Sequence, residues 1–191
     1  MKEIQAQIQE LTSGDDKRSE AAVKALAQIG EEALPYIQEL LSSPHPDTRW
    51  WATWALASFD RPEVSVLLRS LLKDPDISVR QCATLALRGQ PDPQAVPDLI
   101  ELLMEDDSVL VRLAGAALTA VGKEAVPALL ELFQTGPQKA RLEAVRILAA
   151  IRDERAIGTL FEAFQGDSAM MEYWANEGLD RLGIGMVFFN P

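Results

Sequence analysis

The stretch RWWATWAL, at positions 49–56, contains the pattern on which the whole chain is built. It ends at Leu56, and Ala52 stands four residues before that leucine. The same spacing occurs six times, at steps of 30 or 31 residues. The leucines are Leu26, Leu56, Leu87, Leu118, Leu148 and Leu179, and the alanines are Ala22, Ala52, Ala83, Ala114, Ala144 and Ala175. A fixed period of about 20 to 50 residues is typical of solenoids, in which stacked repeats complete one apolar core.

Each repeat is predicted to hold two helices, because apolar residues at helical spacing alternate with short segments of Pro, Gly, Asp and Ser. First helices are expected at about 3–12, 31–42, 62–73, 93–105, 123–134 and 154–165. Second helices are expected at about 16–29, 47–59, 76–88, 107–121, 137–151 and 168–182. The predicted fold class is therefore all-α, a right-handed α-solenoid of about six two-helix repeats.

The repeats are expected to form one domain over residues 1–183, followed by a short tail. Their predicted limits are about 1–30, 31–60, 61–91, 92–122, 123–152 and 153–183. Residues 184–191 fall outside the period and are predicted to cap the last repeat, as terminal repeats generally require. The alternative is that Phe188 and Phe189 fold into a groove beside Trp174 or dock into a partner.

Two further positions recur within the repeats. Pro35, Pro97 and Pro127 follow an apolar residue early in the first helices, so they are predicted to fix where those helices bend or begin. An arginine stands seven residues before the repeat leucine in three repeats, as Arg49, Arg80 and Arg141. We interpret these arginines as a structural ladder that hydrogen-bonds to Asp residues in the turns.

The charge and the cysteine content exclude several classes of protein. The net charge of −11 argues against binding to nucleic acid and to anionic membranes, because both depend on Lys and Arg. Cys82 is the only cysteine, so neither an internal disulfide nor a multi-cysteine metal site can form. We expect a cytoplasmic protein, since the chain shows no signal peptide and no run of about 18 uninterrupted apolar residues.

The segments DPDISVRQCATLAL, at 74–87, and PQAVPDLIELL, at 93–103, resemble HEAT-like repeats. They are most similar to the short variety, of about 30 residues, found in the bilin lyases of phycobilisomes and their relatives. Tetratricopeptide and ankyrin signatures are absent. The resemblance implies a solenoid whose second helices line the concave surface, and it implies a function only weakly, because such repeats serve many roles.

Positions six, five and two residues before the repeat leucine point away from the predicted core. On the geometry implied by the resemblance they line a groove, and its apolar and aromatic character predicts a partner-binding site. The predicted groove residues are Trp50, Trp51, Trp54, Cys82, Leu85, Arg112, Leu113, Tyr173, Trp174 and Glu177. The alternative is that the tryptophans pack against the neighbouring repeat.

No catalytic residues are predicted from the sequence. His45 lies in a Pro-His-Pro turn without an evident partner, and no Gly-rich phosphate loop or metal motif is present. Cys82 is expected on the groove face beside Trp51, where a thiol could meet a chromophore or a redox partner or serve only as a small apolar group.

Two function classes remain open from the sequence. The first is a non-enzymatic scaffold that binds another protein through the aromatic groove and needs no cofactor. The second, implied by the resemblance, is a bilin lyase or bilin-binding subunit that attaches an open-chain tetrapyrrole to a phycobiliprotein cysteine. Such lyases commonly act as paired subunits, so a hetero-oligomer is expected. A HEAT-like DNA glycosylase would need a more basic groove.

Overall fold

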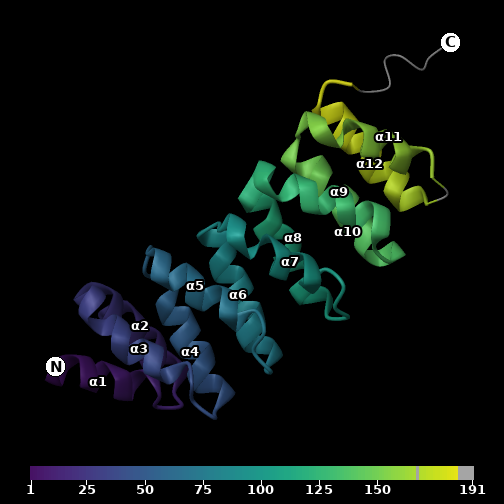
Figure 1. Ribbon diagram of the computed structural model, residues 1–191. Helices are drawn as coiled ribbons and strands as arrows, with labels where there is room; N and C mark the ends of the chain where they lie inside the picture. The colour runs from purple at the N-terminus through teal and green to yellow at the C-terminus, as the bar shows by residue number, and fades with distance from the viewer. Residues whose placement is uncertain (167, 185–191) are drawn as a thin grey trace. The chain divides into compact units, whose positions relative to one another are not determined.

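In the computed structural model, which describes residues 1–166 and 168–184, the regular structure of the described residues is helical. Contacts divide the chain into a first unit, Met1–Gln90, and a second unit, Pro91–Pro191. Figure 1 shows paired helices within each unit. Each unit corresponds to three predicted repeats, and the all-α repeat architecture is confirmed. The single domain over 1–183 stays a prediction, and the predicted tail lies outside the described residues except for Ile184.

The helices of both units follow the predicted pairing closely. In the first unit they are α1 (Lys2–Leu11), α2 (Asp16–Ile29), η1 (Glu31–Ala33), α3 (Leu34–Leu40), α4 (Pro46–Leu56), α5 (Pro62–Leu71) and α6 (Ile77–Gly89). In the second unit they are η2 (Pro93–Ala95), α7 (Val96–Leu102), α8 (Ser108–Val121), η3 (Gly122–Ala125), α9 (Val126–Thr135), α10 (Gln138–Ile151), η4 (Glu154–Ala156), α11 (Ile157–Phe164) and α12 (Ala169–Arg181).

Four of the first helices begin with a separate 3₁₀ turn, which the sequence prediction did not resolve. The α-helices after three of these turns start at Leu34, Val96 and Val126, each directly before a proline. Proline lacks a backbone N–H and is tolerated only in a first turn, so the α-helical ladder restarts there. The prediction that these prolines fix where the helices bend or begin is confirmed.

The leucine and alanine columns form the core of each unit. All twelve residues are buried, and none is more than 4% exposed. In the first unit α4 packs against both α2 and α6, and in the second unit α10 packs against both α8 and α12. The small alanines let these helices approach closely while the leucines fill the space between them. The predicted core positions are therefore confirmed.

The stretch Ser108–Thr135 is long and apolar enough to cross a membrane by length and composition, with a mean hydropathy of 1.3. It is not one straight helix, because Gly122 has φ +77° and η3 separates α8 from α9. Its residues Ala114, Leu118 and Leu129 are fully buried inside the second unit. These features are those of two core helices of the second unit.

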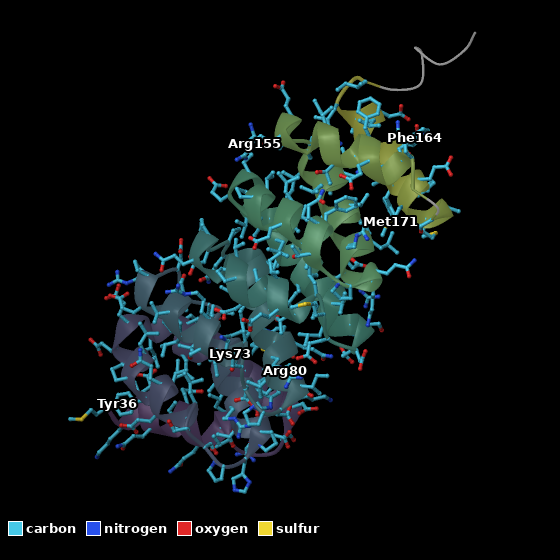
Figure 2. The ribbon with its side chains drawn as sticks, turned by 45° about the vertical axis from the view of Figure 1, so that its right-hand side comes forward. Tyr36, Lys73, Arg80, Arg155, Phe164 and Met171 are labelled. Atoms are coloured by element: carbon cyan, nitrogen blue, oxygen red, sulfur yellow. The ribbon has the colours of Figure 1, made fainter. Side chains whose placement is uncertain are left out.

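An ion pair in the first unit confirms part of the predicted arginine ladder. Arg49, on α4, donates from Nε and Nη2 to the two carboxylate oxygens of Asp74, at 2.7 and 2.8 Å. It also donates to the carbonyl oxygen of Ser43 at 2.9 Å. Arg80, labelled in Figure 2, donates to the carbonyl oxygen of Asp74 at 2.9 Å. Asp74 therefore ties the turn before α6 to two helices.

The pKa of Asp74 reflects these contacts. Burial by itself raises the pKa of the carboxyl, but hydrogen bonds from Arg49 and from the backbone N–H of Asp76 bring it below the ordinary value. Because the pKa is depressed in the folded state, the ionised pair contributes stability above the pKa of an unfolded Asp. That contribution is lost as the pH falls toward the folded value.

We therefore predict that Asp74→Ala lowers the free energy of unfolding by about 3 kcal/mol at pH 7, because it leaves a nearly buried guanidinium without its carboxylate. The difference from wild type should shrink as the pH falls below about 4. Urea titrations from pH 3 to pH 7 measure both effects. Glu10→Gln, which removes an exposed pair with Arg18, is the control and should change stability far less. Equal losses for the two variants would contradict the structural role of Asp74.

Candidate partner-binding surface

Helix α4 presents three tryptophans on one side. The ring of Trp50 meets Trp51 edge-on, with centroids 4.8 Å apart, and stacks on Trp54, with centroids 5.4 Å apart. Trp54 is 40% exposed, and Trp50 and Trp51 are half-buried. We call these three side chains the tryptophan surface. None of the three is a core residue, although Trp50 and Trp51 bury part of their rings.

The opposite side of α4 explains why the rings remain outside. Ala52, Ala55 and Leu56 are buried, so they form the core face of this helix. Thr53 is also buried, and its hydroxyl donates to the carbonyl oxygen of Arg49 at 2.7 Å, which satisfies it within the helix. Small residues and one leucine therefore fill the core face, and the large aromatic residues lie on the free face.

Two hollows border the tryptophan surface within the first unit. The α2–α4 hollow, of about 780 Å³, is lined by Trp50 and Trp51 and by polar residues of α2 and the start of α4. The α4–α6 hollow, of about 370 Å³, is lined by Trp54 and Leu85, among others. Leu85 is itself exposed. Because Trp50 stacks on Trp54, the aromatic rings connect the two hollows.

Cys82 lines the α4–α6 hollow beside α4, but its thiol is largely covered. The side chain is only 6% exposed, and Sγ lies 3.9 Å from the carbonyl oxygen of Trp50. Burial raises the pKa of the Cys82 thiol to about 12. The position faces away from the core of its own helix, but α4 packs across α6 and covers it. Cys82 therefore acts as a small apolar residue at the edge of the α4–α6 hollow.

The other five predicted groove residues lie in the second unit. Arg112 is exposed and lines a hollow of about 140 Å³ together with Arg146. Tyr173 is exposed and meets the half-buried Trp174 edge-on, with centroids 5.1 Å apart. Leu113 and Glu177 are half-buried. These residues keep the outward orientation that their positions predict, and one groove continuous over both units stays a prediction.

The sequence did not predict one contact of the second unit, that between Arg146 and Gly115. A Cβ added to Gly115 would lie 3.1 Å from Nη2 of Arg146, so the guanidinium lies directly against the backbone of α8. Arg146 also donates from Nε to Glu143 at 2.9 Å. Glycine weakens the interior of a helix, so Gly115 within α8 was the feature of the sequence that indicated a close approach to the backbone.

Among residues 1–166 and 168–184, no group of three His, Cys, Asp or Glu side chains is placed to hold a metal ion. The surface of the first unit therefore combines aromatic rings, two hollows with apolar and polar lining residues, and charged side chains. Such a surface can bind a ligand or a protein segment by burial and charge.

The sequence pattern that describes HEAT repeats matches residues 4–88 and, in an overlapping second match, residues 64–138. The chain belongs to the HEAT repeat family. Over 100 residues it is 34% identical to the phycocyanobilin lyase subunit beta of Nostoc sp., an alignment that covers 52% of this chain and 49% of the relative. The chain thus spans about half the length of that relative. The predicted resemblance to the HEAT-like repeats of bilin lyases is confirmed.

Solved structures show the same repeat fold. The complex of CpcE and CpcF of phycocyanin lyase from Nostoc sp. aligns with a TM-score of 0.56 at 20% identity, over 94% of this chain and 77% of that chain. A designed armadillo repeat protein in complex with the peptide (KR)4 aligns with a TM-score of 0.55 at 18% identity, over 94% of this chain and 99% of that chain. At this identity the likeness concerns the fold alone.

We predict that Cys82 of this HEAT repeat protein is unreactive while the protein is folded. At pH 8 a thiol with a pKa of about 12 is almost entirely protonated. Its reaction with 5,5′-dithiobis(2-nitrobenzoic acid) should be slower than in 6 M urea by more than about a hundredfold. Absorbance at 412 nm measures both rates. A native rate close to the unfolded rate would contradict the burial of the thiol.

Proposed function

We propose that this protein is a protein-binding scaffold that holds a segment of a partner protein against the tryptophan surface of the first unit. The observation that supports this most strongly is the partial exposure of three adjacent tryptophans on one helix. Tryptophan is the side chain most enriched among the residues that dominate binding energy, because it buries a large area at a small entropic cost.

The α4–α6 hollow is suited to an apolar anchor from the partner. Trp54 and Leu85 form exposed apolar walls, and the buried Cys82 lies beside them. The side-chain amide of Gln90 donates to the carbonyl oxygen of Ala57 at 2.8 Å, which satisfies that backbone group at the rim. A leucine or phenylalanine side chain would exchange water for contact with the apolar walls of Trp54 and Leu85 here.

A second candidate function is that of a bilin lyase subunit. Its specific support is the 34% identity to a phycocyanobilin lyase subunit over half of this chain. The related phycocyanin lyase structure is a complex of CpcE with CpcF, so a partner subunit is proposed here as well. In this role the indole rings would stack on the conjugated rings of an open-chain tetrapyrrole, and Cys82 would not attach it covalently.

The charges near the tryptophans favour the scaffold over the bilin. An open-chain tetrapyrrole carries propionate carboxylates, which would need cationic groups at the site. The α2–α4 hollow is instead lined by three acidic residues, Asp16, Glu20 and Asp47, and by one lysine, Lys17. Carboxylates of the ligand would be repelled there, which supports a protein segment as the occupant.

The proposed function predicts that partner capture depends on the α4–α6 hollow. Wild type, Trp54→Ala and Leu85→Ala would be immobilised and exposed to a lysate of the source organism, and the bound proteins quantified by mass spectrometry. Each variant should bind the specific partner at least about tenfold more weakly, because it truncates an anchor wall. Val66→Ala, which removes an exposed apolar side chain on α5 outside both hollows, is the matched control.

The visible spectrum of the same eluate separates the two candidates. A colourless eluate with a protein lost only from the Trp54 and Leu85 variants supports the scaffold. An eluate that absorbs visible light and contains a phycobiliprotein supports the bilin lyase subunit instead. Equal capture by all variants would contradict the proposed anchor site in the α4–α6 hollow.

A further inference from the structure

The α2–α4 hollow combines two features that bear on the chemistry of the partner segment. One wall consists of the half-buried indole rings of Trp50 and Trp51. The other lining residues include Asp16 and Glu20 from α2 and Asp47 from the first turn of α4. Indole rings and carboxylates are brought to one hollow by two helices that pack against each other.

The charge in this hollow is predominantly negative. Its lining residues carry three carboxylates and one ammonium group, that of Lys17. Glu20 also accepts a hydrogen bond from Lys24 at 2.7 Å, but both side chains of that pair are largely exposed and the pair is screened by solvent. Lys24 is not a lining residue of the hollow. A ligand in this hollow therefore meets both acidic groups and indole rings.

We propose that the α2–α4 hollow binds a cationic side chain, preferably arginine, of the partner segment. A cation gains from both kinds of group, because an indole ring attracts positive charge over its face and carboxylates pair with it. Arginine suits the site better than lysine, since its planar guanidinium stacks on an aromatic ring while its edge donates to a carboxylate. An anionic or purely apolar side chain would gain from the indole rings at most.

Because the two hollows are connected, they predict which types of residue the partner segment carries. Trp50 and Trp51 line the α2–α4 hollow, and Trp54, stacked on Trp50, lines the α4–α6 hollow. A segment that follows the rings would place a basic residue in the first hollow and an apolar residue in the second. The inference rests on the proposed function for the α4–α6 hollow and adds the charge of the partner.

A titration with a basic peptide tests the inference directly. The probe is an octapeptide of alternating Lys and Arg, added to the full chain labelled with ¹⁵N, and the readout is the indole N–H signals, assigned by single Trp→Phe variants. The signals of Trp50 and Trp51 should shift with the basic peptide. They should stay in place with an octapeptide of alternating Glu and Gln.

A charge-matched pair of variants separates the hollow from the general acidity of the protein. Glu20→Gln combined with Asp47→Asn should weaken the peptide about three- to tenfold, because both remove carboxylates from the hollow. Glu32→Gln combined with Glu39→Gln removes the same charge from exposed positions outside it and should leave the affinity close to wild type. Thermal melts verify that both double variants remain folded.

Three results would overturn the inference. The first is the absence of a Trp50 or Trp51 shift at millimolar peptide, and the second is equal weakening by both double variants. The third is a change of these signals on dilution of the protein alone, which would identify a second copy as the occupant. If partner capture still depends on Trp54 and Leu85 in any of these cases, the proposed function stands and only the cationic chemistry fails. If partner capture does not depend on Trp54 and Leu85 either, the scaffold proposal fails as well.

Discussion

The close approach of neighbouring helices through small residues is the constraint on which the rest of the structure depends. The repeat alanines are buried and let the leucines four positions later reach the adjacent helices. A close approach of this kind lies in the second unit, where a Cβ added to Gly178 of α12 would lie 2.9 Å from Cβ of Ala149 of α10. Dense packing of this kind leaves no room for a larger side chain on the core face.

This constraint also determines where the large side chains lie. On α4 the core face holds Ala52, Ala55 and Leu56, so Trp50, Trp51 and Trp54 occupy the free face. Exposed aromatic residues add little to folding stability, yet they provide strong anchors for a partner. The carboxylates beside Trp50 and Trp51 then bias the surface toward a basic segment. Packing, exposure and charge thus combine to give the first unit its proposed role.

Much of the fold was predictable because the repeat is local. The period of 30 or 31 residues identifies the core positions, and Pro, Gly and Asp mark the breaks between helices. The 3₁₀ turns before Leu34, Val96, Val126 and Ile157 were missed, because apolar periodicity does not distinguish a 3₁₀ turn from the first turn of an α-helix.

The candidate site was predictable only in part. The periodicity shows that Trp54 and Cys82 both face away from the core of their own helices, but it contains no information about the neighbouring helix. That helix covers Cys82 and leaves Trp54 exposed. The same limit applies to Arg146, whose contact with Gly115 depends on the packing of α10 against α8. The hollows and their acidic lining required the structure.

The most direct test of this account compares two residues of α4 that lie two positions apart. Leu56→Ala should lower the free energy of unfolding by about 2 to 5 kcal/mol, because the leucine is fully buried. Trp54→Ala should cost less than half of that, although it removes more atoms, because the ring lies on the free face. Urea denaturation followed by circular dichroism measures both. A Trp54→Ala loss as large as that of Leu56→Ala would place the tryptophan in the core and contradict the binding surface.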